Sequence, residues 1–249
     1  MIIEWTHSPR EECCLFARGK LMSETKLYKT IDGKMKEVSV SMEDAITLYK
    51  EDPLKVYPNG FFKKMRKLRD WQNDAGRKIC KEFNVESVID FGCASGYYLE
   101  GFHEQGAKIK GYEYAYENTK EFIPEHIFDY VEFGDAQEPL SKEEYDMSFS
   151  IEVAEHILPE KSEQFVENLC KSSKRFVVFS AAPPGQGGTC HINERPFAEW
   201  ESMFRLNGFH KNGRGTQILR EAVFKKLVSR GPYVRLLSRQ VTLFKKESF

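Results

Sequence analysis

The sequence lacks the C-x-x-C spacing that is typical of metal-binding and redox-active cysteines. The 249 residues include 6 cysteines, but no two of them form a C-x-x-C pair, which argues against a structural zinc site or a disulfide framework. The first residues lack the apolar segment of a signal peptide, and no apolar run approaches the roughly 18 residues of a membrane-spanning helix. We therefore expect a protein of the reducing cytoplasm that makes no contact with a membrane.

A large net charge is also missing. Lys and Arg number 37 against 38 Asp and Glu, so the net charge is −1, and the protein as a whole is not drawn to nucleic acid. The basic residues are nevertheless uneven, because they are concentrated at 63–69 and from residue 205 onward. Such runs are most often solvated helix faces, and a polyanion-binding surface is the less common explanation.

The third absence is the fingerprint of dinucleotide-binding proteins, G-x-G-x-x-G. Residues 88–99 (VIDFGCASGYYL) instead contain an apolar run that ends at Asp90, a small-residue loop with Gly92 and Gly96, and an amphipathic segment. This order predicts a strand, a tight turn and a helix. The glycines let the backbone approach a ligand, and the helix N-terminus favours polar or anionic groups. The G-x-x-x-G spacing argues against a pyrophosphate site.

Acidic residues close the next two predicted strands. Residues 108–113 end at Glu113, whose carboxylate offers paired acceptors for the two vicinal hydroxyls of a ribose. Residues 130–133 are followed by a glycine and then Asp135. With a fourth strand over 145–151, the alternation of strands and helices predicts an α/β fold that binds ligands at the carboxyl ends of its strands.

Two carboxylates and an imidazole follow the fourth strand. If Glu152-Val-Ala-Glu-His continues into a helical turn, Glu152, Glu155 and His156 lie at i, i+3 and i+4 on one face. Such a face is a reasonable metal half-site or acid–base cluster. The alternatives are a segment that packs beneath a substrate and a glutamate that interacts with the helix dipole.

The segment Asp90–Gly96 resembles motif I of class I S-adenosylmethionine-dependent methyltransferases, (D/E)-x-G-x-G-x-G, with Ala94 in place of the middle glycine. The resemblance covers about residues 60–249. It implies a Rossmann-like α/β fold with a seven-stranded, mostly parallel sheet, helices on both faces and the strand order 3-2-1-4-5-7-6. It also implies S-adenosylmethionine as the cofactor, with Asp135 where the family's acid accepts from the adenine amino group. The cofactor-binding residues expected on this basis are Asp90, Gly92, Cys93, Ala94, Gly96, Glu113, Tyr114, Asp135, Ala136 and Ser150.

The E-x-x-E-H segment is similar to that of the ubiquinone-pathway O-methyltransferases and the small-RNA 2′-O-methyltransferases. The resemblance implies a divalent metal held by Glu152, Glu155, His156 and His191, with His191 upstream of an aromatic-x-Glu-Trp segment, Phe197–Trp200. Two oxygens and two nitrogens suit Mn²⁺, Fe²⁺, Co²⁺ or Zn²⁺ better than Mg²⁺, although magnesium can serve if abundance decides. We expect His156, His191 and Glu152 to be catalytic. His191 as a metal-free general base and a packing or substrate-orienting role are the alternatives.

Residues 1–58 are predicted to form a small α/β appendage or lid, and residues 59–249 the methyltransferase domain. The appendage contains a hairpin with a turn at Asp32-Gly33 and a helix capped by Ser41. Prolines and a glycine between 53 and 60 indicate a linker, which is followed by one amphipathic helix over 61–83.

Three functions are consistent with this pattern. The first is O-methylation of a hydroxyl on a small polar metabolite such as a saccharide, a catechol or a polyketide-like alcohol. The second is 2′-O-methylation of RNA, which the basic segments favour and the near-zero net charge disfavours. The third is N-methylation, nicotinamide oxidoreduction or cofactor binding without catalysis. The acceptor and the oligomeric state are not encoded in motifs, because variable loops build acceptor pockets.

Overall fold

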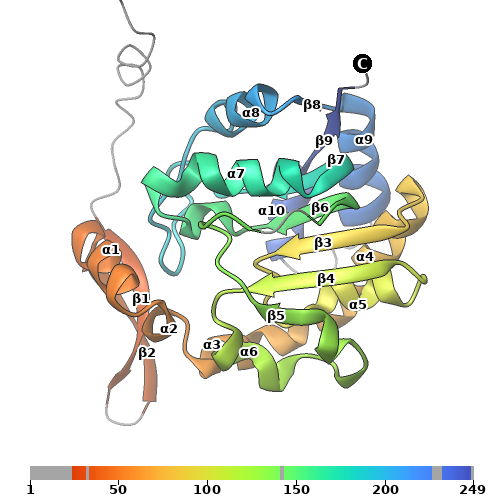
Figure 1. Cartoon of the computed structure of the whole chain (residues 1–249). Helices are drawn as coiled ribbons and strands as arrows, with labels where there is room; N and C mark the ends of the chain where they lie inside the picture. The colour runs from red at the N-terminus through yellow and green to blue at the C-terminus, as the bar shows by residue number, and fades with distance from the viewer. Residues whose placement is uncertain (1–23, 32–33, 141–142, 226–231, 248–249) are drawn as a thin grey trace, which may run out of the picture.

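The computed structural model describes residues 24–31, 34–140, 143–225 and 232–247. Its strands are β1 (Glu24–Ile31), β2 (Lys34–Ser41), β3 (Ser87–Phe91), β4 (Lys108–Glu113), β5 (Val131–Phe133), β6 (Tyr145–Ile151), β7 (Ser173–Ser180), β8 (Phe209–Lys211) and β9 (Thr242–Lys246). Within the described residues, seven of these strands form one sheet in the order β5-β4-β3-β6-β7-β9-β8, and β1 and β2 form a separate hairpin (Figure 1).

The topology of the large sheet confirms the predicted fold. Numbered along the chain, its strand order is 3-2-1-4-5-7-6. β3 pairs in parallel with β4 and β6, β4 with β5, and β6 with β7, whereas β9 is antiparallel to both β7 and β8. The sheet is therefore Rossmann-like with a reversed final hairpin, and ligands of such sheets bind at the carboxyl ends of the parallel strands.

Helices cover both faces of this sheet. The α-helices are α1 (Met42–Glu51), α2 (Pro53–Val56), α3 (Asn59–Met65), α4 (Arg69–Phe83), α5 (Tyr97–His103), α6 (Tyr116–Thr119), α7 (Ser162–Lys171), α8 (Phe197–Leu206), α9 (Gly213–Ile218) and α10 (Pro232–Gln240). The 3-10 segments are η2 (Arg66–Leu68), η3 (Lys120–Phe122), η4 (Glu125–Tyr130), η5 (Ala154–His156) and η6 (Pro159–Lys161), and η7 (Leu219–Phe224) is π-helical. Side chains of α4, α5, η7 and α10 share one buried cluster with the sheet, and those of α7 and α8 share another.

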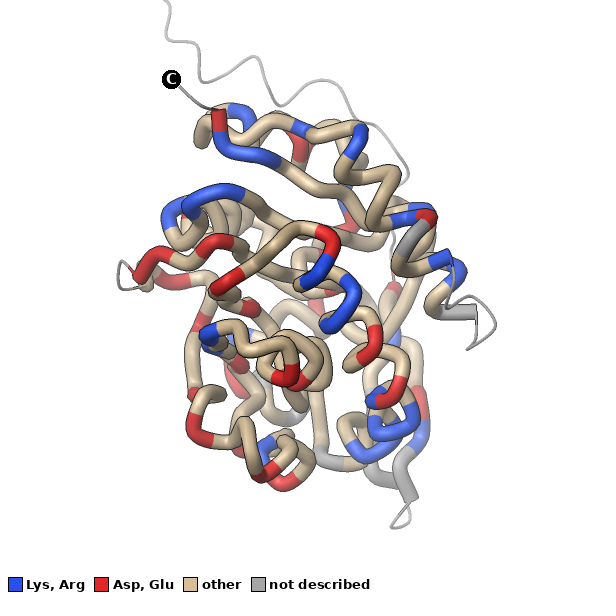
Figure 2. The backbone as a smooth tube through the Cα atoms, turned by 90° about the vertical axis from the view of Figure 1, so that its right-hand side faces the viewer, with Lys and Arg blue, Asp and Glu red and all other residues tan. Residues whose placement is uncertain are grey.

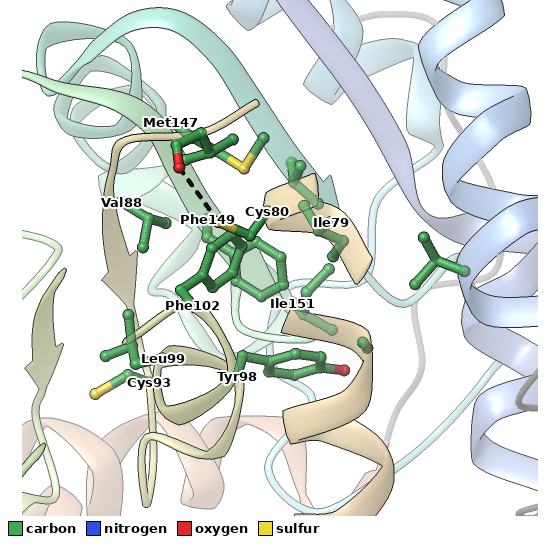
Figure 3. Close-up of a cluster of buried hydrophobic side chains, with 14 of the residues drawn as sticks. Ile79, Cys80, Val88, Cys93, Tyr98, Leu99, Phe102, Met147, Phe149 and Ile151 are labelled. Carbon is green, nitrogen blue, oxygen red and sulfur yellow. Dashed lines mark hydrogen bonds between the residues drawn. The ribbon is translucent and has the colours of Figure 1, made fainter. Parts of the chain in front are cut away.

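The first cluster anchors the loop after β3. Figure 3 shows Ile79 and Cys80 of α4 gathered with Tyr98 and Phe102 of α5 around Phe149 of β6. The ring centroid of Phe149 lies 4.9 Å from that of Tyr98 and 5.9 Å from that of Phe102. Burying an aromatic side chain of this size stabilises the fold by about 1.5–3 kcal/mol. The N-terminus of α5, where the loop ends, is thus held rigidly against the sheet.

The single helix predicted over 61–83 is wrong. The segment is two α-helices, α3 and α4, joined by the 3-10 turn η2. A 3-10 turn has about 3.0 residues per turn instead of 3.6, so it rotates the apolar face between the two helices. Phe61 and Phe62 of α3 line a cavity, whereas Trp71 and Ile79 of α4 pack against the sheet.

Residues 24–58 build a small unit in which the hairpin of β1 and β2 is followed by α1 and α2. β1 and β2 pair antiparallel from Glu24 with Ser41 to Ile31 with Lys34, and the predicted Asp32-Gly33 turn lies outside the described residues. Ser41 caps α1 by accepting the amide of Asp44. This unit lies beyond the arrowheads of β3 and β4 (Figure 1), which mark the carboxyl ends of the sheet.

The core of the unit is completed by residues from the loop after β7. Leu27, Ala45 and Tyr49 are buried together with Cys190 and Ile192 from the loop after β7. The Cys190 amide donates to the Lys26 carbonyl at 2.7 Å. The unit therefore packs on the domain rather than hanging from a linker.

Figure 2 shows that basic and acidic positions are interspersed along the described backbone. The basic segment 63–69 occupies α3, η2 and the first residue of α4, and its Lys and Arg residues are exposed. No helix within the described residues is long and apolar enough to span a membrane.

Candidate functional site

A cavity of about 530 Å³ opens at the carboxyl ends of β3, β4 and β6. Most of the residues predicted to bind cofactor or metal line it: Asp90, Gly92, Cys93, Ala94, Glu113, Tyr114, Asp135, Ala136, Glu152, Glu155, His156 and His191. The opposite wall comes from the N-terminal unit and α3, with Tyr49, Tyr57, Phe61 and Phe62. The fold therefore brings predicted residues from five separate segments to one place.

Two predicted cofactor residues lie outside the cavity wall. Gly96 is the N-cap of α5, in the left-handed region with φ 71°. The Ser150 hydroxyl donates to the Phe91 carbonyl at 3.1 Å and is fully buried between strands. Ser150 therefore holds β6 against the end of β3, and its side chain is not free for a ligand.

The loop after β3 has a backbone that explains its small residues. Gly92 has φ 77°, and a Cβ on it would come within 2.6 Å of the Val153 side chain. Ala94 has φ 49° although it is not a glycine, a conformation that costs an L-residue about 1–2 kcal/mol. The structure thus explains why the related motif has a glycine at the position that Ala94 fills here.

Glu113 joins this loop to the end of β4. One carboxylate oxygen accepts the Ala94 amide and the other the Ala115 amide, both at 2.8 Å. Burial raises the pKa of Glu113, while these two hydrogen bonds oppose the shift. Each oxygen keeps one further lone pair, so the carboxylate can still accept from two hydroxyls.

Asp90 and Asp135 lie on either side of Glu113 in the cavity wall. Burial, and secondarily Glu113, raise the pKa of Asp90 well above its usual value. Asp135 accepts the Gln137 amide at 2.9 Å and its side-chain nitrogen at 3.2 Å. The rim of the sheet is therefore rich in carboxyl acceptors.

The helical turn predicted to align Glu152 with Glu155 and His156 does not form. Glu152 has φ 56°, which is left-handed and outside any helix, and only Ala154–His156 form the 3-10 turn η5. The Glu152 carboxylate accepts from the Ser180 hydroxyl at 2.7 Å and from Gln186 at 3.3 Å. With this left-handed residue, the Glu152 carboxylate is bonded at the end of β7 and does not share a helix face with the other two side chains.

Glu155, His156 and His191 do converge, and we call them the inner cluster. One potential ligand atom from each lies within 4.8 Å of the others, and the two imidazole centroids are 5.0 Å apart. Glu155 is fully buried, and its carboxylate oxygens have no hydrogen-bond partner of good geometry among the described residues. Burial, reinforced by Glu152, raises the pKa of Glu155 well above its usual value.

His191 is oriented by a residue that the sequence analysis missed. Its Nδ1 lies 2.8 Å from Oε1 of Glu194. The same oxygen accepts the Gly187 amide, and Oε2 accepts the Gly185 amide, both at 2.7 Å. A carboxylate accepts only, so Nδ1 carries the proton and Nε2 is left with a lone pair. The H-x-x-E spacing was the available signal, because carboxylates commonly orient ligating histidines.

His156 is oriented from two sides. Its Nδ1 lies 2.8 Å from the Tyr57 hydroxyl and 3.1 Å from the Cys190 carbonyl. Burial, with a smaller effect of His191, lowers the pKa of His156 to about 3. Burial also lowers the pKa of His191, against the opposing effect of Glu194. Both imidazoles are therefore neutral at pH 7, the state in which a histidine can bind a metal or accept a proton.

Comparison with known proteins agrees with this geometry. A magnesium protoporphyrin IX methyltransferase from Synechocystis PCC 6803 with bound S-adenosylhomocysteine superposes with a TM-score of 0.52 at 13% identity, over 73% of this chain and 84% of that chain. The same enzyme with S-adenosylmethionine gives 0.51 and 12%, over 73% and 80%. No curated protein matches the sequence. Residues 61–228 match the family model of the methyltransferase domain. The chain therefore belongs to the methyltransferase-domain family and is a class I S-adenosylmethionine-dependent methyltransferase.

Proposed function

We propose that this methyltransferase acts on a hydroxyl group of a small polar acceptor, and that the inner cluster holds a divalent cation beside that hydroxyl. The observation that carries the proposal is the Glu155 carboxylate, which is fully buried beside two neutral imidazoles. Among the described residues it has no cationic side-chain partner, and only the backbone amides of Glu155 and Ala182 oppose the rise of its pKa. An uncompensated buried charge costs several kcal/mol. A cation or a proton on this site removes that cost.

The cofactor half of the cavity follows from the loop after β3. We assign the methionine and ribose parts of the cofactor to Asp90, Gly92–Ala94 and Glu113, and the adenine to Tyr114, Asp135 and Ala136. Glu113 keeps two lone pairs toward the cavity. Gly96 supports this half through its backbone as the N-cap of α5, and Ser150 supports it through its hydroxyl, which links β6 to β3.

The chemistry of the acceptor half favours oxygen over nitrogen. Methyl transfer from a sulfonium is an in-line displacement, so alignment of donor and acceptor is the main task of the protein. A neutral amine needs no further help, whereas a hydroxyl is a poor nucleophile that gains from a base or a metal. A buried group of one carboxylate and two imidazoles fits that need.

The three side chains suit a cation such as Mn²⁺, Fe²⁺, Co²⁺ or Zn²⁺, because one oxygen and two nitrogens form a borderline donor set. A bound cation would lower the pKa of the acceptor hydroxyl. Glu194 fixes the His191 tautomer and exposes Nε2, which without a cation can itself take the hydroxyl proton. Glu152 lies in the same wall with its carboxylate held by Ser180 and Gln186, where it can position the acceptor.

RNA is the second candidate acceptor. Lys67 of η2 and Leu236 of α10 both line the cavity, so the basic segments that contain them border its walls. A phosphate backbone would contact such residues, and its binding would weaken steeply with salt. The net charge of −1, with basic and acidic positions interspersed along the backbone in Figure 2, favours the small acceptor.

Residues 1–58 complete the proposal as a lid over the acceptor half. Tyr49 and Tyr57 of this segment line the cavity. We expect a chain beginning at Pro58 to bind S-adenosylmethionine and to lose turnover, because the acceptor wall is gone.

The deciding experiment supplies labelled S-adenosylmethionine to metal-stripped protein with hydroxylated metabolites, amines or short RNAs, with and without Mn²⁺. Label on a hydroxyl that requires Mn²⁺ supports the proposal. Full turnover in excess chelator leaves His191 as an ordinary base, and label on amines alone contradicts O-methylation.

A further inference from the structure

The hydroxyl of Tyr57 has a role that the cofactor and acceptor assignments do not use. It lies 2.8 Å from Nδ1 of His156, although the two residues are 99 positions apart in the sequence. The two rings meet edge to face, with centroids 5.6 Å apart and an interplanar angle of 89°. Tyr57 belongs to the N-terminal unit, so that unit reaches the inner cluster directly.

The position of Tyr57 is fixed from the core of the domain. Asn118 of α6 donates both to the Tyr57 carbonyl at 2.9 Å and to the Leu54 carbonyl at 3.0 Å. On its other side the Tyr57 ring packs against Phe61, with centroids 5.6 Å apart. The hydroxyl is thus held by backbone and ring contacts that do not depend on His156.

The hydrogen bonds around Nδ1 determine which tautomer His156 adopts. The Cys190 carbonyl, 3.1 Å from Nδ1, can only accept. The Cys190 thiol lies near the Tyr57 hydroxyl, since after burial it contributes to the raised pKa of Tyr57, while the hydroxyl opposes the rise in the pKa of Cys190 that burial causes. When the Tyr57 hydroxyl donates its proton to that sulfur, the hydroxyl oxygen is left to accept from His156. The Nδ1–H group of His156 then has two acceptors, this oxygen and the Cys190 carbonyl. A neutral imidazole with its proton on Nδ1 has its lone pair on Nε2.

His191 reaches the same state by a different route, through Glu194. Two histidines that both carry Nδ1–H leave two Nε2 lone pairs for one ligand. We propose that Tyr57 is a positioning residue that holds His156 in the Nδ1–H tautomer, so that the N-terminal unit is part of the catalytic centre and not only a lid. The consequence for turnover rests on the function proposed above, whereas the tautomer itself does not.

The test is Tyr57→Phe in the full chain, which removes one oxygen atom and keeps the ring. Nitrogen-15 NMR of the histidine side chains in the metal-free protein should show one His156 tautomer, Nδ1–H, in the unsubstituted chain and a mixture in the variant. Cobalt affinity and kcat should each fall about 10- to 100-fold, as for other residues that orient a ligating histidine. The Kd for S-adenosylmethionine should be unchanged.

The matched control is Tyr145→Phe. The Tyr145 ring is buried, and its hydroxyl donates to Glu143 at 2.7 Å at the opposite end of β6. This variant should keep the His156 tautomer, cobalt affinity and kcat. It reports what the loss of one tyrosine hydroxyl costs by stability alone.

An Nε2–H tautomer in the unsubstituted chain, or an unchanged tautomer in Tyr57→Phe, overturns the inference. Failure of the proposed function gives a different result. In that case cobalt does not bind the unsubstituted chain, while the His156 tautomer still changes in Tyr57→Phe, and the positioning role stands without the metal.

Discussion

Two groups of acidic and histidine side chains in the described residues are close enough to bind a cation. The inner cluster is Glu155, His156 and His191, and the second group, which we call the outer cluster, is Glu100, Glu104 and His126. Both bring one potential ligand atom per residue within 4.8 Å. Residue types and distances alone do not separate them.

The two clusters differ in the charged and polar donors that contact their carboxylates. Glu100 is paired with Arg69 through both carboxylate oxygens. Glu104 accepts from Asn73 at 2.9 Å and from Arg77 at 2.8 Å, and although partial burial works against it, these bonds lower the pKa of Glu104. Glu155 has no such donor among the described residues. A carboxylate already paired with arginine has little to gain from a cation, whereas an unpaired buried one has much.

The largest expected difference between the two clusters is the loss of kcat when a histidine of each is replaced. His191→Ala should lower kcat at least about 100-fold, because it removes a metal ligand or the base itself. The Kd for S-adenosylmethionine should not change, since no cofactor residue is altered. His126→Ala, the matched substitution in the outer cluster, should leave kcat within about twofold. Equal losses in the two variants would contradict the assignment of the inner cluster.

The next largest expected difference is in metal affinity, between variants of Glu155 in the inner cluster and Glu104 in the outer cluster. Glu155→Gln should weaken cobalt binding about 10- to 100-fold, as measured by visible absorption during titration of stripped protein. Glu104→Gln should leave cobalt affinity unchanged. Cobalt binding that depends on Glu104 instead would assign the cation to the surface.

The free energy of unfolding should change in opposite directions when Glu155 and Glu100 are each replaced by glutamine. Because the folded-state pKa of Glu155 lies above its ordinary value of 4.5, the folded protein binds more protons than the unfolded one above that pH. The stability of the metal-free chain therefore falls as pH rises from about 4.5 through the raised pKa. Glu155→Gln removes this contribution and should stabilise the metal-free protein by about 1–3 kcal/mol at pH 8.

Glu100→Gln is the counterpart, because it breaks a compensated pair. It should destabilise the protein by about 1–2 kcal/mol, since it removes charged hydrogen bonds to Arg69. Urea unfolding at pH 5 and pH 8 measures both variants. A destabilised Glu155→Gln at pH 8 would show that the Glu155 charge is compensated after all.

The smallest effect concerns the backbone beside the inner cluster. Four non-glycine residues in the described part of the chain have a positive φ. Ala94, Glu152 and Cys190 lie at or next to the cavity, whereas Asn84 ends α4. Ala94→Gly relieves about 1–2 kcal/mol of strain but gives back about 0.5–1 kcal/mol of chain entropy. Thermal unfolding should thus show a gain of about 0–1.5 kcal/mol, with cofactor affinity within twofold.

The sequence by itself determined the α/β class and the small-residue loop after β3, because strand and helix periodicity is local information and the motif from Asp90 to Gly96 marks where β3 ends. The strand order was expected only from the resemblance of that motif to the family, and the sheet confirms it. The acids Glu113 and Asp135 could be placed in one cavity because parallel strands end at the same edge. Their positions in the structure bear out that reasoning.

Only the tertiary structure decided how the candidate catalytic side chains are grouped. The spacing of Glu152 suggested a shared helix face, but a left-handed residue turns it toward Ser180, and no periodicity reveals such a turn. Tyr57 and Glu194 reach the histidines through contacts that depend on how the N-terminal unit and the loop after β7 pack. Hydrogen bonds between distant segments follow from packing, because residues 99 positions apart meet only when the chain is folded.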